Sequence, residues 1–235
     1  MNVRGMAGRS SEALVRAMHH WEGRRQAAGP GSAPAGFTVA ISREVGALGT
    51  SVARAVGERL GWPVYDHELL EQIAREQNLR VGLLESVDER RTSWIEECLE
   101  AFAEIPAVSN SAYVRYVTET VLSLAAHGEC VIVGRGAAQI LPPASTLRVR
   151  LVAPVERRVE WMMRERHLSQ ADAARQVSHT EHERARFVRD HYQKDPADQH
   201  GYDLILNTGR LSVADSAGLI VDALHRLAGA PAATP

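Results

Sequence analysis

Lysine is almost absent from this chain. Among 27 basic residues in 235, Lys194 is the only lysine, so arginine carries nearly all of the positive charge. With 29 acidic residues the formal net charge is −2, which gives no global signal for binding to nucleic acid or to an anionic membrane. The arginine guanidinium is a planar fork of donors that suits phosphate, so arginine is the side chain to look for at a phosphate site.

Cysteine and long apolar runs are scarce as well. The two cysteines, Cys98 and Cys130, have no partner spacing, which indicates reduced thiols and predicts a cytoplasmic protein. There is no apolar run of about 18 residues for a membrane span, and no N-terminal apolar core of about 7–15 residues for a secretory signal. The histidines lack metal-ligand spacing, since the pair His179 and His182 has no third ligand. We therefore expect no membrane partner and no histidine-based metal site.

The ends of the chain differ in composition from its middle. We predict a flexible N-terminal extension over residues 1–36, with a short amphipathic helix at Ser11–Gln26 and a Pro/Gly/Ala linker at Ala27–Gly36. Residues 231–235 are predicted to be a disordered tail. The compact domain then spans residues 37–230, which is long enough to bury a full core.

Within this domain, short apolar stretches alternate with helical patterns. Strands are predicted at 38–42, 62–65, 130–133, 147–153 and 203–207. Helices are predicted at 50–60, 67–77, 81–104, 112–126, 155–166, 169–191 and 213–227. This alternation predicts a three-layer α/β fold around a mostly parallel sheet. Helix 81–104 carries an apolar stripe that packs either on the core or on a second protomer, and the latter would make a homodimer.

The stretch TVAISREVGALGTS, residues 38–51, has the order strand, glycine loop, helix. Such a loop aims backbone N–H groups and a helix N-terminus at an anion. The full phosphate-loop signature, G-x-x-x-x-G-K-[ST], adds a lysine that this loop lacks. Arg43 could supply that charge, and Ser51 or Thr50 could offer a hydroxyl to Mg²⁺ or phosphate. The alternative is a plain strand-to-helix turn with Ser51 as the helix N-cap.

Two polar residues follow other predicted strands, where ligands bind in open parallel sheets. Arg135 stands between two glycines after the apolar strand CVIV, well placed to hold a phosphate with both arms of its fork. The alternative is a surface ion pair. Asp66 follows the second strand and either binds an acceptor group or caps the next helix.

A third group of candidates lies in the charged stretch HTEHERARFVRDHY. Arg186 and Arg189 are three residues apart and share a helix face, whereas Arg184 points elsewhere. Arginines on such a helix could close over a transferred phosphate and neutralise its charge. The alternative is a solvated face, with ion pairs to the acidic residues of the same helix.

Taken together, several segments resemble one family. ISREVGALG, LGWPVYDHELL, HGECVIVGRGA, LVAPVERRVEWM, HLSQADAARQV, HTEHERARFVRDHY and YDLILNTGRLS occur in the order seen in cytidylate kinase-like proteins, which are P-loop nucleoside monophosphate kinases. The resemblance covers roughly residues 37–227. It implies a P-loop NTPase fold with a five-stranded parallel core, a helical acceptor-binding insertion over 67–127 and a helical lid over about 168–195.

The resemblance also implies roles for single residues. Arg135 matches the arginine that holds the acceptor nucleotide, and Arg184 resembles an arginine of the lid. Three positions depart from the pattern: Gly49 aligns with the loop lysine, Thr50 stands where the subfamily has arginine, and Gly136 replaces an aspartate.

The leading hypothesis is an ATP- and Mg²⁺-dependent phosphotransferase acting on a nucleoside monophosphate such as CMP or dCMP. The residues expected to bind the ATP phosphates are Gly46, Ala47, Leu48, Gly49, Thr50 and Ser51, with Ser51 also on Mg²⁺. The catalytic candidates are Arg43, Arg135, Arg184, Arg186 and Arg189, and the acceptor-binding candidates are Asp66, Arg135 and Arg184. One alternative is a degenerate kinase that binds a nucleotide or phosphate as a regulatory module. Another is a kinase for a different small acceptor.

Overall fold

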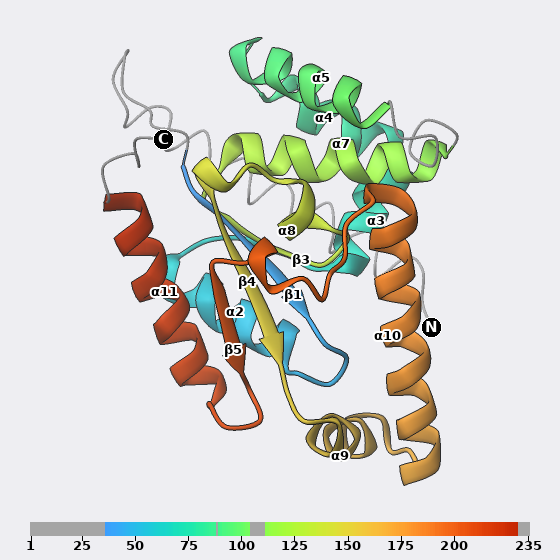
Figure 1. Ribbon diagram of the computed structural model, residues 1–235. Helices are drawn as coiled ribbons and strands as arrows, with labels where there is room; N and C mark the ends of the chain where they lie inside the picture. Colours follow the sequence, from blue (N-terminus) through green and yellow to red (C-terminus); the bar gives the residue numbers. More distant parts are fainter. Residues whose placement is uncertain (1–35, 88, 104–110, 230–235) are drawn as a thin grey trace.

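The computed structural model describes residues 36–87, 89–103 and 111–229. The predicted N-terminal helix at 11–26, its linker up to residue 35 and the tail at 231–235 lie outside these residues. Five strands form one sheet, in the order β2-β3-β1-β4-β5 (Figure 1). They are β1 (Thr38–Arg43), β2 (Val64–Tyr65), β3 (Cys130–Val133), β4 (Thr146–Val152) and β5 (Leu204–Asn207). All four pairings are parallel, so the predicted sheet is confirmed.

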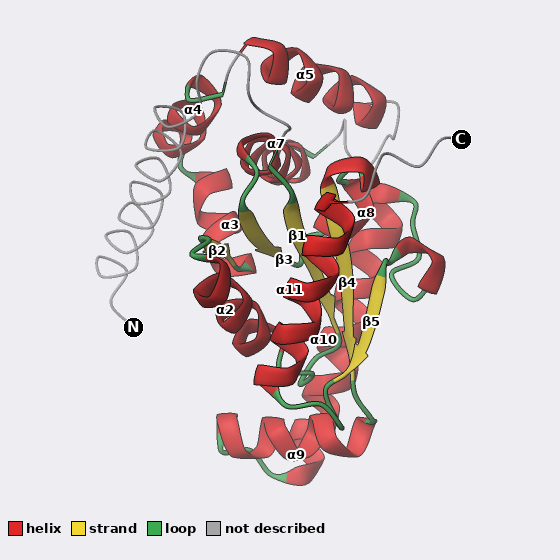
Figure 2. Cartoon of the chain, turned by 90° about the vertical axis from the view of Figure 1, so that its left-hand side faces the viewer, coloured by secondary structure: helices red, strands yellow, loops and turns green. Residues whose placement is uncertain are grey.

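Alternation of side chains along β1 divides the core into two layers. Val39 and Ile41 lie in one apolar cluster, which includes side chains of α2 (Gly49–Leu60) and α11 (Val213–Gly229). Ala40 belongs to a second cluster on the opposite face. Helices covering that face include α3 (His67–Arg75), α7 (Ala112–His127) and the short α8 (Ala137–Ile140). Figure 2 shows the resulting three layers, helix, sheet and helix.

The strand order places the carboxyl end of β1 at the centre of the sheet. After β1 the chain moves to one side for β2 and β3 and then to the other side for β4 and β5. In open α/β sheets, ligands bind where the connections diverge in this way. The loop that follows β1 therefore lies at the position that the fold favours for a site.

The predicted helix over 81–104 is wrong, because the structure has two helices there: α4 (Gln77–Glu85) and α5 (Glu89–Ala103). The break follows Ser86, whose hydroxyl donates to the carbonyl of Leu83 (2.6 Å) and lies 2.9 Å from Nε2 of His127. Trp94 and Cys98 of the predicted stripe pack against the cluster of α3 and α7. These two side chains thus pack on the chain's own core. The homodimer stays a prediction, and the packing of this helix no longer supports it.

Two further helices lie next to the loop that follows β1. Helix α9 (Val155–Arg166) and the long α10 (Gln170–Tyr192) pack against each other through Val159, Met162, Ala173 and Val177, with Val45 of the loop in the same cluster. Short 3-10 turns at Pro143–Ser145 and Gln199–Gly201 complete the described elements. In the ranges that the structure describes, no helix has the length and apolarity to cross a membrane.

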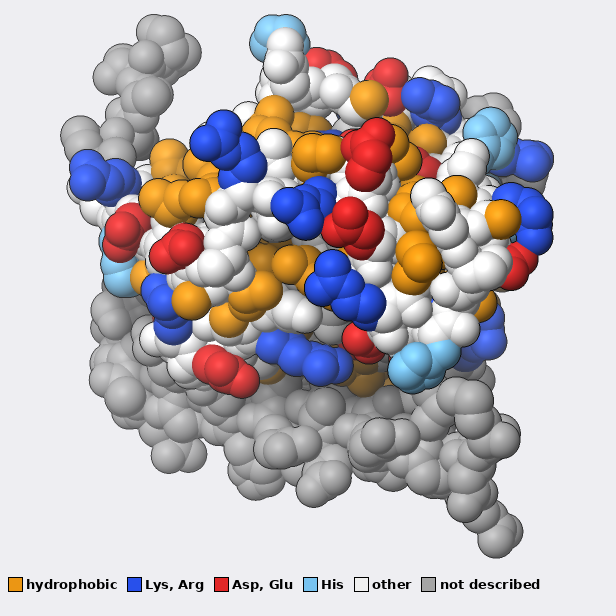
Figure 3. All heavy atoms as spheres, turned by 90° about the horizontal axis from the view of Figure 1, so that it is seen from below, with side chains coloured by type: hydrophobic (Ala, Val, Ile, Leu, Met, Phe, Trp, Pro, Cys, Tyr) orange, Lys and Arg blue, Asp and Glu red, His pale blue; other side chains and the backbone are white. Residues whose placement is uncertain are grey.

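The surface seen from below carries both signs of charge. Figure 3 shows basic and acidic side chains interspersed on the described part of this face, without a patch of one sign. Pairs such as Arg157 with Glu160 (3.2 Å) and Arg164 with Glu160 (3.6 Å) are of this mixed kind. This face therefore gives no indication of an extended surface for nucleic acid.

Candidate functional site

The loop after β1 ends in a left-handed residue that opens α2. The helix begins at Gly49, and its N-cap is Leu48, at φ 56° and ψ 23°. The alternative that Ser51 is the N-cap is therefore wrong: Ser51 lies in the first turn, exposed to solvent. A bulky side chain in this conformation costs roughly 1–2 kcal/mol, and Leu48 offsets that cost by packing on the core. The conformation leaves the first N–H groups of α2, which have no partner within the helix, at the mouth of the loop.

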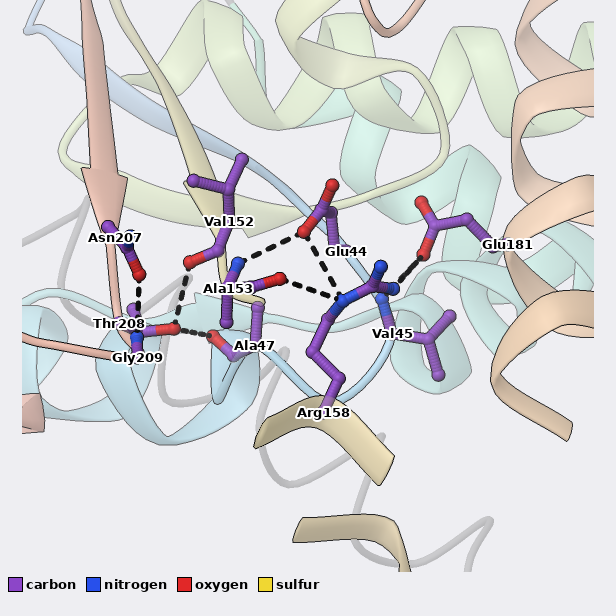
Figure 4. Close-up of polar contacts among 10 residues, drawn as sticks. All are labelled: Glu44, Val45, Ala47, Val152, Ala153, Arg158, Glu181, Asn207, Thr208 and Gly209. Carbon is purple, nitrogen blue, oxygen red and sulfur yellow. Dashed lines mark hydrogen bonds and ion pairs between the residues drawn. The ribbon is translucent and has the colours of Figure 1, made fainter. Parts of the chain in front are cut away.

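Gly46 sits where the loop touches α9. Its φ is +82°, and a Cβ at this position would lie 2.6 Å from the carbonyl oxygen of Arg158. No other residue type fits there without moving the helix. On the far side of the loop, the hydroxyl of Thr208 lies 3.1 Å from the carbonyl oxygen of Ala47 and 3.2 Å from that of Val152 (Figure 4). The loop is thus held from both sides by residues distant in sequence.

A charge network ties this loop to α10 (Figure 4). The backbone N–H of Val45 donates to Oε2 of Glu181 (2.8 Å), which also accepts from Arg158 (3.3 Å). Nε of Arg158 lies 3.4 Å from Glu44, whose carboxylate accepts the backbone N–H of Ala153 (3.0 Å). We call Glu44, Arg158 and Glu181 the loop-side network. Here the positive charge is matched by two carboxylates of the protein.

Arg43, the last residue of β1, passes between two glycines. A Cβ on Gly49 would lie 2.5 Å from its Cγ, and a Cβ on Gly134 would lie 2.3 Å from its Nη1. Burial, followed by the charges of Arg184 and Arg135, lowers the pKa of Arg43 from 12.5 to about 9. Arg43 is therefore charged at neutral pH but poorly compensated. In the described part of the chain, no carboxylate forms an ion pair with it.

Beside Arg43, a cavity of about 630 Å³ opens beneath α10. This volume is in the range of small-molecule sites. Five arginines line it: Arg43, Arg135, Arg150, Arg184 and Arg189. The loop residues 46–51 are not part of the lining, so the loop and the cavity are neighbouring regions that meet at Arg43 and Glu44.

Arg135 projects from a strained backbone at φ 50°. Its guanidinium pairs with Glu71 of α3, and its Cζ lies 5.4 Å from the ring centre of Phe187 on α10. The pair is no surface feature, since each side chain is only 23% exposed. Burial lowers the pKa of Arg135, and its Nε is buried without a hydrogen-bond partner among the described residues. An acceptor atom from a ligand would satisfy this nitrogen.

The structure explains why Gly136 follows Arg135. A Cβ at Gly136 would lie 2.3 Å from the ring of Tyr192, whose hydroxyl lies 3.2 Å from that of Thr118. The tyrosine at the end of α10 thus fills the space that a side chain at position 136 would need. An aspartate at this position would therefore clash with the ring of Tyr192.

Asp66 caps α3, since its Oδ1 accepts the N–H of Leu69 at 3.1 Å. The capping alternative is therefore confirmed, and binding of an acceptor stays a prediction. The next residue, His67, also lines the cavity. Burial, then the charges of Arg43 and Arg135, lower the pKa of His67 to about 4, so the imidazole is neutral at physiological pH.

On α10, Arg184 and Arg189 line the cavity but Arg186 does not. Arg186 is 73% exposed and pairs with Asp190 one turn further on (3.1 Å). Sharing a helix face with Arg189 does not bring it to the site, because the pair holds its long side chain in solvent. Arg189 itself pairs with Asp195 (3.1 Å).

Two arginines near the site were not predicted from the sequence. Arg158 holds the loop, and Arg150 lines the cavity. A signal was present for Arg150, because LRVRLVA places charged residues inside a central strand, where an all-parallel sheet normally has apolar ones.

The parallel sheet, the glycine loop that opens α2 and the arginine-lined cavity beside it are consistent with a P-loop kinase-like fold. A model of the cytidylate kinase-like family matches residues 38–210, and the chain belongs to that family. The chain is 28% identical over 184 residues to a cytidylate kinase of Pyrobaculum aerophilum (78% of this chain, 90% of that protein). It is 23% identical over 205 residues to a cytidylate kinase of Methanopyrus kandleri (81% and 96%).

Two other similarities give less information about function. A segment of 119 residues, half of this chain, is 33% identical to a uronate isomerase of Corynebacterium glutamicum but spans only 23% of that protein. The crystal structure of an uncharacterized protein from Eubacterium ventriosum superposes with a TM-score of 0.56 at 19% identity, covering 80% of this chain and 98% of that one. The latter similarity supports the fold alone.

Proposed function

We propose that the protein transfers a phosphoryl group from ATP to a nucleoside monophosphate. The observation that carries the proposal is the position of Arg43. Its side chain runs between Gly49, at the start of α2, and Gly134, beside Arg135. Its aliphatic stem therefore borders the loop, and its guanidinium lies beside Gly134 on the cavity side, where a phosphoryl group in transit would pass. This is the charge that the missing loop lysine would otherwise supply.

The ATP phosphates would bind the loop over 46–51 through backbone N–H groups at the start of α2. Mg²⁺ fits the hydroxyls available there, since it keeps several waters and takes few protein ligands. Ser51, in the first turn of the helix, would hold it, with Thr50 adjacent. When bound, Mg²⁺ neutralises charge on the phosphates.

The acceptor phosphate would bind between Arg135 and Arg184, and Asp66, the N-cap of α3, is a further candidate for contacting the acceptor. Phosphoryl transfer needs mainly positioning and charge compensation, and these arginines supply both. Burial is the largest cause of the lowered pKa of Arg43, and repulsion by Arg184 and Arg135 lowers it further, against the opposing charges of Asp66 and Glu181. An entering phosphate would relieve this repulsion. Two of the relatives are cytidylate kinases by name, and this supports CMP or dCMP as the acceptor of this protein.

A second candidate is a phosphate-binding regulatory module without turnover. One observation favours it: the carboxylate of Glu181 already accepts the N–H of Val45 in the loop. A bound triphosphate would then face a negative charge close by.

The deciding experiment is an assay for ADP with ATP, Mg²⁺ and a panel of nucleoside monophosphates. We expect ADP formation with a cytidine nucleotide, and a loss of about 10²–10³-fold in kcat for Arg43→Ala. Arg43→Lys should recover part of the rate, because it restores the charge without the fork. Arg54→Ala, exposed on α2, is the matched control and should be unchanged.

Two results would contradict the proposal. Unchanged turnover in Arg43→Ala would remove Arg43 from the mechanism. Absence of ADP with every acceptor, together with measurable ATP binding, would favour the regulatory module.

A further inference from the structure

Arg150 is a cation in the middle of a parallel sheet. It lies on β4 opposite Ser42, and Ala40, two residues before Ser42, packs in the cluster on the face of α7 and α8. Since side chains alternate along a strand, Arg150 projects to that same face, opposite to α2. It therefore lines the part of the cavity that lies against the sheet, away from the start of α2.

A neighbour on the same strand gives the comparison. Arg148, also on this face, makes two hydrogen bonds to Asp203, at 3.1 Å from Nε and 2.7 Å from Nη2. Its charge is therefore matched by a carboxylate in a fork-to-fork pair. Arg150 has no such partner: in the described ranges its contacts are Ser42 Oγ (2.9 Å) and the ring of Tyr202 (5.7 Å to its centre).

The carboxylates that line the cavity are all engaged elsewhere. Glu44 and Glu181 share Arg158, and Glu183 lies 3.4 Å from Nε2 of His179. A guanidinium has five N–H donors, and one neutral hydroxyl satisfies one of them. Arg150 thus presents unused donors and an unmatched charge to the cavity.

The surroundings of Arg150 are polar and fixed. The hydroxyl of Tyr202 lies 3.2 Å from Ser42 Oγ, receives a hydrogen bond from Gln139 (2.7 Å) and donates to the carbonyl of Pro196 (2.8 Å). Ser42, Gln139 and Pro196 all line the cavity with Arg150. Such a hydrogen-bonded wall holds the guanidinium in one place at little entropic cost on binding.

We propose that Arg150 forms a second anion subsite, and that the acceptor carries a further anionic group besides the phosphate that receives the phosphoryl. This inference rests on the proposed function for the identity of that first phosphate. The ligand class is a nucleotide with two separated anionic groups, such as a nucleoside bisphosphate with a second phosphate on the ribose. Arg43, Arg135 and Arg184 bind one group, and Arg150 binds the other with its fork.

A direct measurement of ligand binding tests this subsite without relying on catalytic turnover. Isothermal titration of the full chain with cytidine 3′,5′-bisphosphate, cytidine 2′,5′-bisphosphate and cytidine 5′-monophosphate gives three affinities. We expect one bisphosphate to bind about tenfold or more tightly than the monophosphate, as for one added charge-assisted pair. Arg150→Gln should abolish this preference and leave the affinity for the monophosphate within twofold. Arg175→Gln, which is 74% exposed on α10, is the control and should keep the preference.

Several outcomes would overturn the subsite. They are an equal affinity of the wild type for all three nucleotides, a preference that survives in Arg150→Gln, and an equal loss for all three ligands in that variant. If Arg150→Gln does not fold, Arg150→Lys keeps the charge without the fork and should retain only part of the preference. An unchanged preference in that variant counts against the subsite. Failure of the proposed function would appear separately, as absence of ADP formation in the kinase assay.

Discussion

Arg158 and Arg43 lie on either side of the same loop, yet their surroundings are opposite. Arg158 contacts two carboxylates, Glu44 and Glu181, within 3.4 Å. Arg43 instead faces Arg135 and Arg184, and its pKa is lowered by burial and by both of them. On the loop side the described arginine is matched by two carboxylates. On the cavity side Arg135 and Arg189 have carboxylate partners, and Arg43, Arg150 and Arg184 form no ion pair with a described residue.

The difference separates arginines that have a carboxylate partner from arginines that have none among the described residues. A matched pair holds elements in place: here it joins the loop to α9 and α10. Unmatched buried cations cost stability, so they persist where a ligand supplies the opposite charge. Arg43, Arg184 and Arg150 form no ion pair with a described residue, whereas Arg148 and Arg158 pair with carboxylates of other elements.

The largest effect that would test this difference is expected from two arginines of α10, one that lines the cavity and one that does not. Arg184→Ala should lower kcat/KM for the acceptor by about 50–100-fold, because it removes a cation that faces the bound phosphate. Arg186→Ala should stay within about twofold, because an exposed helical pair contributes little. The measurement is steady-state kinetics on both variants. Equal losses would mean that distance from the cavity does not separate the two residues.

A smaller effect is expected from the loop side. Glu181→Gln keeps an oxygen for the N–H of Val45 but removes a negative charge close to the loop. We expect about fivefold tighter binding of ATP, since one nearby charge at an effective dielectric of about 20 contributes on the order of 1 kcal/mol after screening. Titration calorimetry measures this, with Glu160→Gln as an exposed control on α9. Weaker binding would instead show that the Glu181 charge holds the loop in its binding shape.

The last prediction concerns the dependence of stability on pH. Burial, Arg43, Arg135 and Arg184 lower the pKa of His67 to about 4, against the opposing charge of Asp66. Between pH of about 6.5 and 4 the unfolded chain therefore binds the extra proton, so this residue makes stability fall as the pH falls through that window. His67→Asn should flatten this part of the profile in urea unfolding between pH 7.5 and 4.5. His225→Asn, at an exposed position on α11, should leave the profile as it is, and an unchanged slope in His67→Asn would contradict the assignment.

Most of the fold was predictable because it depends on local patterns. Short apolar runs and helical stripes located all five strands and most helices, with boundaries within about two residues. The predicted helix at 81–104 is interrupted at Ser86, whose hydroxyl donates to the carbonyl of Leu83 and also contacts His127, forty-one residues away. The spacing of apolar residues along a helix cannot predict such a contact.

The sequence by itself determined the family, the parallel sheet, the glycine loop without lysine, and Arg43 and Arg135 as candidates at strand ends. The family follows from the resemblance of several motifs to cytidylate kinase-like proteins, and the other features follow from the sequence pattern and from the rule that carboxyl ends of parallel strands meet at one edge. Only the tertiary structure decided which arginines are matched. Arg158 meets Glu44 and Glu181, Arg148 meets Asp203, and Arg150 meets no acid among the described residues. Charge compensation depends on distances between elements far apart in the chain, and no local pattern encodes them.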